Sequence, residues 1–151
     1  MQLKFIAISA LLLLNISSMA HADNSGILGK WITREGKSHV EISQCDAGLC
    51  GKVVWLRDAV YPADDRQGMA GKKKVDRENP DPKLRSTPIL GLNVLKGFRT
   101  RNGSVWEDGT IYDPENGKTY KCKMTLTNSK QLDLRGFIGF SWIGRTTTWT
   151  R

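Results

Sequence analysis

Short segments in which apolar and polar residues alternate run through most of this chain, and they constrain its fold more than any other feature. The clearest is Thr119–Thr127, where Tyr120, Cys122, Met124 and Leu126 alternate with polar residues. Because successive side chains of a strand point to opposite faces, this pattern predicts a strand with one buried face. Seven more segments carry strand signals: Lys30–Thr33, His39–Ser43, Lys52–Leu56, Leu92–Arg101, Ser104–Tyr112, Gln131–Ile138 and Arg145–Thr150. The sequence therefore predicts an all-β fold of about eight strands.

The later strands are joined by tight turns, which indicates an antiparallel order. Asn102-Gly103 is a strong hairpin signal, and Pro114 and Gly117 stand where a turn favours them. The stretch from Leu92 to Ile138 is therefore predicted to be an antiparallel meander. Eight strands connected in this way favour a sheet that closes into a barrel, because closure leaves no exposed edge. An open sandwich is the alternative.

The segment Asp58–Ile89 interrupts the strand pattern. It holds four prolines and several charged runs, with little periodic apolar content. A stretch of this length without regular structure is unusual inside a compact domain. We expect one long loop between the third and fourth strands, either a functional cover or a mobile excursion. The only regular element that we expect in it is a helical turn within Ala59–Met69.

The first 22 residues have the layout of a secretory signal peptide. Lys4 precedes the apolar run Phe5–Ile16, and Ala20-His21-Ala22 is a typical cleavage pattern. The apolar run is shorter than the roughly 20 residues that a membrane-spanning helix needs. We therefore expect cleavage after Ala22, a periplasmic or secreted protein with a single domain over residues 23–151, and no membrane span. A retained membrane anchor is the alternative.

Two of the three cysteines are placed to pair in an oxidising compartment. Cys45 and Cys50 enclose four residues and flank a predicted hairpin turn, which brings them within disulfide reach. A loop this short adds only about 2 kcal/mol to stability in the chain-entropy model, so the bond fixes one hairpin rather than the whole fold. Cys122 is left over on the apolar face of its strand. We expect a buried free cysteine there, and a reactive thiol is the alternative.

The chain is basic, with a formal net charge of +8. If it is exported, nucleic acid is excluded as a partner, and the charge favours anionic envelope components such as lipid head groups or glycans. A basic surface that only keeps the protein soluble is the alternative. The cations that would form an envelope-binding surface are Lys72–Lys74, Arg77, Lys83, Arg99 and Arg101.

Known catalytic and metal-binding patterns are missing from the sequence. His39 is the only histidine after the predicted cleavage site, and Glu107 and Asp108 would face opposite sides of a strand. A zinc site built from His39 and the cysteines would lose two ligands to a disulfide, and the acidic residues lack calcium-loop spacing. We therefore expect no enzyme activity, no metal and no cofactor.

Several motifs together resemble a bacterial family. The most specific are Asn79-Pro80-Asp81-Pro82 and Arg135-Gly136-Phe137-Ile138-Gly139, and Gly29-Lys30-Trp31 opens the first predicted strand. Over nearly all of residues 23–151 the chain resembles the exported "domain of unknown function 2147" family. The resemblance implies a lipocalin-like up-and-down β-barrel and no assigned activity. In such barrels the Trp of Gly-x-Trp closes one end. We expect Trp31 to have this structural role and to stack on Arg145 or Arg151.

Two groups of residues are candidates for ligand binding. Pro80 and Pro82 stiffen the long loop, which then offers fixed polar groups on a rigid cover. These polar groups are Asp76, Asn79, Asp81 and Arg85. Either Arg85 meets an acidic group of a ligand, or Arg85 and Asp81 tie the loop to the barrel.

The second candidate group is aromatic. Trp55, Trp106 and Tyr120 either line a cavity for a small apolar or amphipathic ligand or fill the core. The functional hypothesis is a binding module with its ligand in the barrel mouth, beneath the long loop. The alternative is an envelope protein that binds anionic lipid or glycan and holds no internal ligand.

Overall fold

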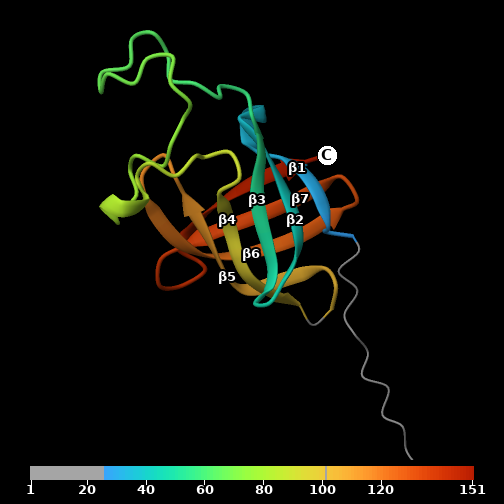
Figure 1. Ribbon diagram of the computed structural model, residues 1–151. Coiled ribbons are helices and arrows are strands. Elements are labelled where there is room, and N and C mark those ends of the chain that lie inside the picture. Colours follow the sequence, from blue (N-terminus) through green and yellow to red (C-terminus); the bar gives the residue numbers. More distant parts are fainter. Residues whose placement is uncertain (1–25, 101) are drawn as a thin grey trace, which may run out of the picture.

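The computed structural model describes residues 26–100 and 102–151, and eight strands in them close into an antiparallel barrel (Figure 1). This confirms the predicted all-β class and the up-and-down order, while the predicted signal peptide and Arg101 lie outside the described residues. The strands are β1 (Gly29–Ile32), β2 (Ser38–Cys45), β3 (Gly48–Leu56), β4 (Asn93–Thr100), β5 (Val105–Asp113), β6 (Lys118–Asn128), β7 (Gln131–Phe137) and β8 (Gly144–Thr150). None of the helical turns in these residues is long and apolar enough to cross a membrane.

A dense apolar core fills one end of the barrel and forms a floor. Trp31, Phe98 and Trp106 are each at most 1% exposed. Gly109 lies beneath the Phe98 ring, and a β-carbon at that position would collide with the ring. The smaller side chains around them are also buried: Ile27, Ile42, Leu49, Leu95, Met124 and Leu132. Because this end is packed with side chains, only the opposite end of the barrel is open to hold another molecule.

A short seam between the first and last strands closes the barrel. Ile32 of β1 lies opposite Thr150 of β8, and this is the one residue pair that joins the two strands. The C-terminal Arg151 supports the seam, since its guanidinium donates to the carbonyls of Gly26, Leu28 and Ser129 at 2.6–2.9 Å. The C-terminus accordingly lies beside β1 (Figure 1).

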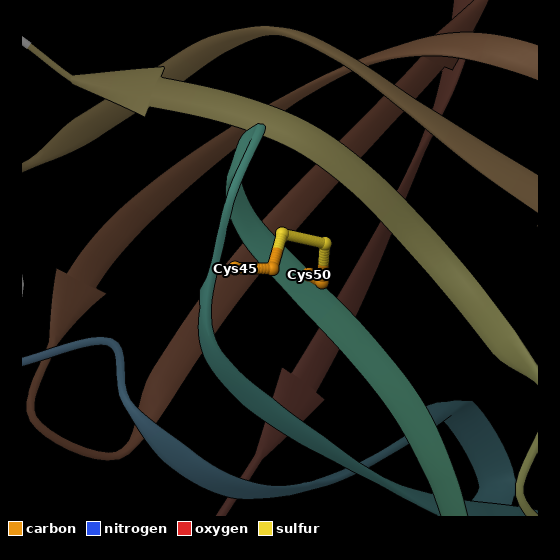
Figure 2. Close-up of a disulfide and its surroundings, with 2 residues drawn as sticks. All are labelled: Cys45 and Cys50. Atoms are coloured by element: carbon orange, nitrogen blue, oxygen red, sulfur yellow. A yellow bond between two sulfur atoms is a disulfide. The ribbon is translucent and has the colours of Figure 1, made fainter.

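The predicted disulfide between Cys45 and Cys50 is present at the β2–β3 hairpin (Figure 2). The hairpin turns more tightly than expected, because Cys45 pairs with Gly48 and Cys50 pairs with Ser43. The two cysteines are therefore diagonal rather than directly opposed, with 5.9 Å between their Cα atoms. The bond crosses the hairpin next to its turn and fixes the register there.

The long loop between β3 and β4 rises from the open end of the barrel and projects beyond it (Figure 1, green). Its one helical turn is a 3-10 helix at Pro82–Leu84, so the expectation of a helical turn within Ala59–Met69 was wrong. Asp81 caps this turn by accepting a hydrogen bond from the backbone amide of Lys83 at 3.0 Å. The proline pair that suggested a stiff loop thus also nucleates its only helical turn.

Candidate ligand-binding site

A cavity of about 1280 Å³ opens where β1, β3, β5 and β7 end. Its inner wall is apolar and comes from alternate positions of several strands, as the strand periodicity predicts. These wall residues are Val40, Val53, Ile111, Leu134 and Trp149. Charged side chains line the rim, and the floor residue Trp31 lies outside the cavity lining. An apolar wall with a polar rim suits a molecule with an apolar body and a polar end.

The long loop contributes Tyr61, Val75 and Ile89 to the cavity lining. Tyr61 is 5% exposed, and its hydroxyl donates to the Val75 carbonyl at 2.9 Å and accepts from the Val75 amide at 3.2 Å. The Arg77 guanidinium lies over the Tyr61 ring, 4.3 Å from its centroid, and pairs with Asp65 at 2.7 Å. These contacts give the loop an internal scaffold, so it forms an ordered part of the cavity wall.

The ion pair between Asp65 and Arg77 predicts that the loop is sensitive to acid. Hydrogen bonds from Arg77, and then from the Met69 amide, hold the pKa of Asp65 below its usual value of 3.8. A carboxyl with a lowered pKa in the folded state stabilises that state above its ordinary pKa, and loses this contribution as pH falls through the lowered value. We expect limited proteolysis within residues 58–75 to accelerate below pH 3.8. In Asp65→Asn this acid step should be absent, and equal acid sensitivity of both proteins would contradict the assignment.

Asp76 fastens the loop to the barrel. Its side chain is 0% exposed and accepts two hydrogen bonds of 2.7 Å, from the Tyr112 hydroxyl of β5 and from the Asn79 amide. Burial, together with the Asp76 carboxylate, raises the pKa of Tyr112 well above its usual value of 10.0. Tyr112 therefore stays protonated and donates to Asp76 throughout the physiological range. This buried anchor fixes the loop against β5 at the rim of the cavity.

The other candidate polar residues of the loop bond within it and are absent from the cavity lining. The Arg85 guanidinium donates to the Asn79 carbonyl at 2.8 Å, and the Asp81 carboxylate caps the 3-10 helix. Among the described residues, the side chains of Asp81 and Arg85 hydrogen-bond only within the loop, whereas Asp76 makes the contact with the barrel. None of these four polar residues lines the cavity, so the geometry gives no support to a contact between Arg85 and a ligand in the barrel.

The three candidate aromatic residues occupy three different environments. Tyr120 lines the cavity, and Trp106 is buried in the floor. Trp55 lies on the outer surface, 43% exposed, with its ring 4.4 Å from that of His39. Of the two alternatives, Tyr120 follows cavity lining and Trp106 follows core filling, whereas Trp55 follows neither. For Trp55 the reason is a bulge in β3: Val40 pairs with Val53 and His39 with Trp55, and the extra residue reverses the side-chain direction.

The two arginine candidates for stacking on Trp31 are also separated. Arg151 lies over the Trp31 ring with its guanidinium carbon 4.2 Å from the centroid. Arg145 instead lines the cavity near its rim, and its side chain forms no hydrogen bond or ion pair within the described part of the chain. Arg145 was missed as a cavity residue, although its even spacing from Trp149 along β8 places both on the same face.

Cys122 is a free cysteine, 2% exposed, inside the barrel wall. Burial raises the pKa of its thiol to about 12, so almost no reactive thiolate forms at neutral pH. We expect the native protein to react with a maleimide at least a hundredfold more slowly than the urea-unfolded protein, followed by mass spectrometry. Rapid labelling without unfolding would contradict a purely structural thiol.

Residues 26–100 and 102–151 contain no group of three or more His, Cys, Asp or Glu placed to hold a metal.

One protein family matches almost all of the described chain. The model described as "Uncharacterized protein conserved in bacteria (DUF2147)" matches residues 29–151, which spans all eight strands and the long loop. The chain belongs to the DUF2147 family. In this DUF2147 protein the matched residues include both the cavity wall and the Asp76 anchor. No curated protein matches the sequence.

A solved structure with a similar fold is described as "Protein HP1028 from the human pathogen Helicobacter pylori belongs to the lipocalin family". It shares 23% sequence identity with the DUF2147 protein at a TM-score of 0.68. The similarity covers 87% of this chain and 84% of that one. The expected lipocalin-like barrel is therefore confirmed at the level of the fold.

Proposed function

We propose that this DUF2147 protein binds a small apolar or amphipathic molecule in the mouth of its barrel. The observation that carries the proposal is the cavity of about 1280 Å³ with apolar walls. The packed floor leaves a single open end, and the ordered loop covers part of it. A barrel of eight strands is wide enough to hold one small ligand, and the lipocalin-like fold supports this use.

The side chains of the rim indicate which polar group the ligand carries. Arg145 lines the cavity without a carboxylate partner among the described residues, so it is free to bind an acidic group. A guanidinium binds a carboxylate through charge-assisted, often bidentate hydrogen bonds. The proposed ligand is therefore an amphiphile with its apolar body against Val53 and Leu134 and its anionic end at Arg145.

Ligand binding is tested first on material from the cell. Native mass spectrometry of protein purified from its own compartment should show a bound small molecule that denaturation releases. An empty barrel that also fails to bind a long-chain fatty acid or a fluorescent apolar probe in titrations would overturn the proposal.

Arg145→Ala should weaken binding of a long-chain fatty acid about tenfold or more, because a hydrogen bond to a charged group contributes roughly 1.5–3 kcal/mol. Calorimetry with the fatty acid and with the alcohol of equal chain length separates the head group from the tail. The alcohol should bind both proteins equally. Lys121→Ala, which removes an exposed cation of β6, is the matched control. If the fatty acid and the alcohol lose affinity equally, Arg145 has no role in recognising an acidic group.

We also propose that the protein acts after export and binds its ligand without catalysing a reaction. The leader-like segment and the Cys45–Cys50 disulfide support export. Terminal sequencing of protein from the envelope fraction should give Asp23 as the first residue. Recovery of the chain from the cytoplasm with Met1 still attached would contradict export.

A second candidate function is binding to anionic envelope components without an internal ligand. It is favoured by Lys72 and Lys73, which are exposed on the long loop and form no ion pair with any described residue. Such a contact must weaken as salt is added. Pelleting with cell-wall material across a salt series, with Lys72→Ala/Lys73→Ala for comparison, tests it. Salt-independent pelleting would contradict it.

A further inference from the structure

The connection between β7 and β8 exposes an unusual amount of apolar surface. We call residues 138–143 the β7–β8 tip; it forms a loop that projects from the barrel (Figure 1). Its four large apolar side chains are all mostly exposed: Ile138 at 72%, Phe140 at 63%, Trp142 at 71% and Ile143 at 64%. Single exposed apolar side chains are ordinary, whereas a contiguous group of this kind marks a contact surface.

The β7–β8 tip is held in this exposed shape by specific contacts. Arg135 of β7 donates from Nε to the Ser141 carbonyl at 2.6 Å and from Nη2 to the Trp142 carbonyl at 3.0 Å. Its third contact, from Nη1 to Thr146 Oγ1 at 3.1 Å, anchors the same guanidinium to β8. The rings of Phe140 and Trp142 stack on each other with centroids 4.5 Å apart. The two rings therefore form one outward-facing apolar unit on a supported loop.

The strands that carry the tip are strongly basic. Residues 116–151, which include β6, β7 and β8, contain seven basic residues and one acidic residue, Asp133. Of these cations, Arg151 lies at the barrel floor with Lys130 beside it, Lys123 pairs with Glu107 of β5, and Arg135 contacts the tip. Lys121 lies opposite Phe137, at the base of the tip, and Arg145 follows the tip after Gly144. An apolar projection flanked by cations is complementary to a surface with an apolar interior and anionic head groups.

The tip also borders the cavity. Ile138 and Ile143 belong to the cavity lining together with Arg145, so the exposed apolar surface continues into the barrel mouth. A membrane in contact with the tip would therefore lie directly beside the opening of the cavity.

We propose that the β7–β8 tip inserts into the head-group region of an anionic lipid bilayer, with Phe140 and Trp142 as the inserted side chains and Lys121, Arg135 and Arg145 facing the lipid head groups. Aromatic side chains favour the interface between lipid and water, and each nearby cation adds attraction to an anionic leaflet. This contact is independent of whether the cavity binds a ligand. It also differs from the Lys72–Lys73 surface, because it needs apolar insertion as well as charge.

The test is the partition of the protein, as recovered from the cell envelope, onto vesicles. We expect binding to vesicles of phosphatidylcholine with phosphatidylglycerol and much weaker binding to phosphatidylcholine alone. Phe140→Ser/Trp142→Ser should bind the anionic vesicles at least tenfold more weakly. Trp55→Ser, which removes an exposed aromatic ring on the outer face of β3, and Lys72→Ala/Lys73→Ala should bind as the unchanged protein does.

Three further measurements make the result decisive. Lipids brominated near the head group should quench the fluorescence of the unchanged protein, and this quenching should largely disappear in Trp142→Phe, which retains an aromatic side chain. Equal partitioning of the serine variant, or equal binding to neutral vesicles, would overturn the proposal. So would a concentration-dependent dimer in sedimentation that the serine variant abolishes without any vesicle binding, since the tip would then contact a second copy of the chain. Probe binding to the cavity in the same variant reports separately on the proposed function.

Discussion

Replacing Trp31 by alanine should lower the free energy of unfolding by about 3–5 kcal/mol, the range for removing a large aromatic side chain from a packed core. Trp31 is 0% exposed, its Nε1 donates to the Ile27 carbonyl at 2.8 Å, and Arg151 stacks on its ring. The substitution removes the packing of the ring, the hydrogen bond and the stacking contact, and it leaves a cavity in the barrel floor. Urea unfolding followed by circular dichroism measures the loss.

Two control variants separate these contributions. Trp31→Phe keeps most of the packing and loses the hydrogen bond to Ile27, so we expect a loss of about 1–2 kcal/mol. Trp55→Ala removes the same side chain from the outer surface, where it is 43% exposed, and should cost less than about 1 kcal/mol. If the Trp31 and Trp55 variants were equally stable, the floor would not depend on Trp31 as the structure indicates.

Replacing Asp76 by alanine should destabilise the protein by about 2–4 kcal/mol and release the long loop from the barrel. The substitution leaves the partly buried Tyr112 hydroxyl and the Asn79 amide without their acceptor, and hydrogen bonds to a charged group contribute roughly 1.5–3 kcal/mol each. We expect cleavage of the loop by trypsin at least tenfold faster than in the unchanged protein. Affinity for a cavity ligand should fall with it.

Asp81→Ala is the matched control in the same loop. Asp81 is exposed and caps only the short 3-10 helix, so its loss should cost about 1 kcal/mol or less and leave the trypsin rate nearly unchanged. Tyr112→Phe removes only the partner on β5 and should reproduce most of the Asp76→Ala effect on the loop. Trypsin resistance in Asp76→Ala would show that the loop is held by other contacts.

The eight strands were predictable because apolar alternation is a local property that the sequence records directly. In β6, Cys122 and Met124 face the core as the pattern requires. The disulfide was predictable for a similar reason, since its partners are close in sequence. What alternation cannot show is where a strand gains an extra residue. The bulge in β3 reverses Trp55, which for that reason was wrongly placed in the cavity.

The candidate site was less predictable because it depends on contacts between distant segments. Asp76 and Tyr112 are 36 residues apart, and nothing local marks them as partners. The Asn-Pro-Asp-Pro motif predicted that this loop borders the ligand site. The polar groups of the motif, however, form hydrogen bonds within the loop. Arg145 and Arg151 lie on one short C-terminal segment, and only the direction of β8 decides that one lines the mouth and the other stacks on Trp31.

The single residue pair between β1 and β8 has a consequence for how the molecule acquires its shape. β1 can pair with its second neighbour only once β8 is available, so closing the barrel joins Ile32 to Thr150 across nearly the entire described chain. Because the two strands are far apart in sequence, we expect this closure to be slower than formation of the hairpins between consecutive strands. Until then Trp31 lacks a complete enclosure. If the chain is exported as proposed, almost all of it must cross the membrane before its apolar interior is sealed from water.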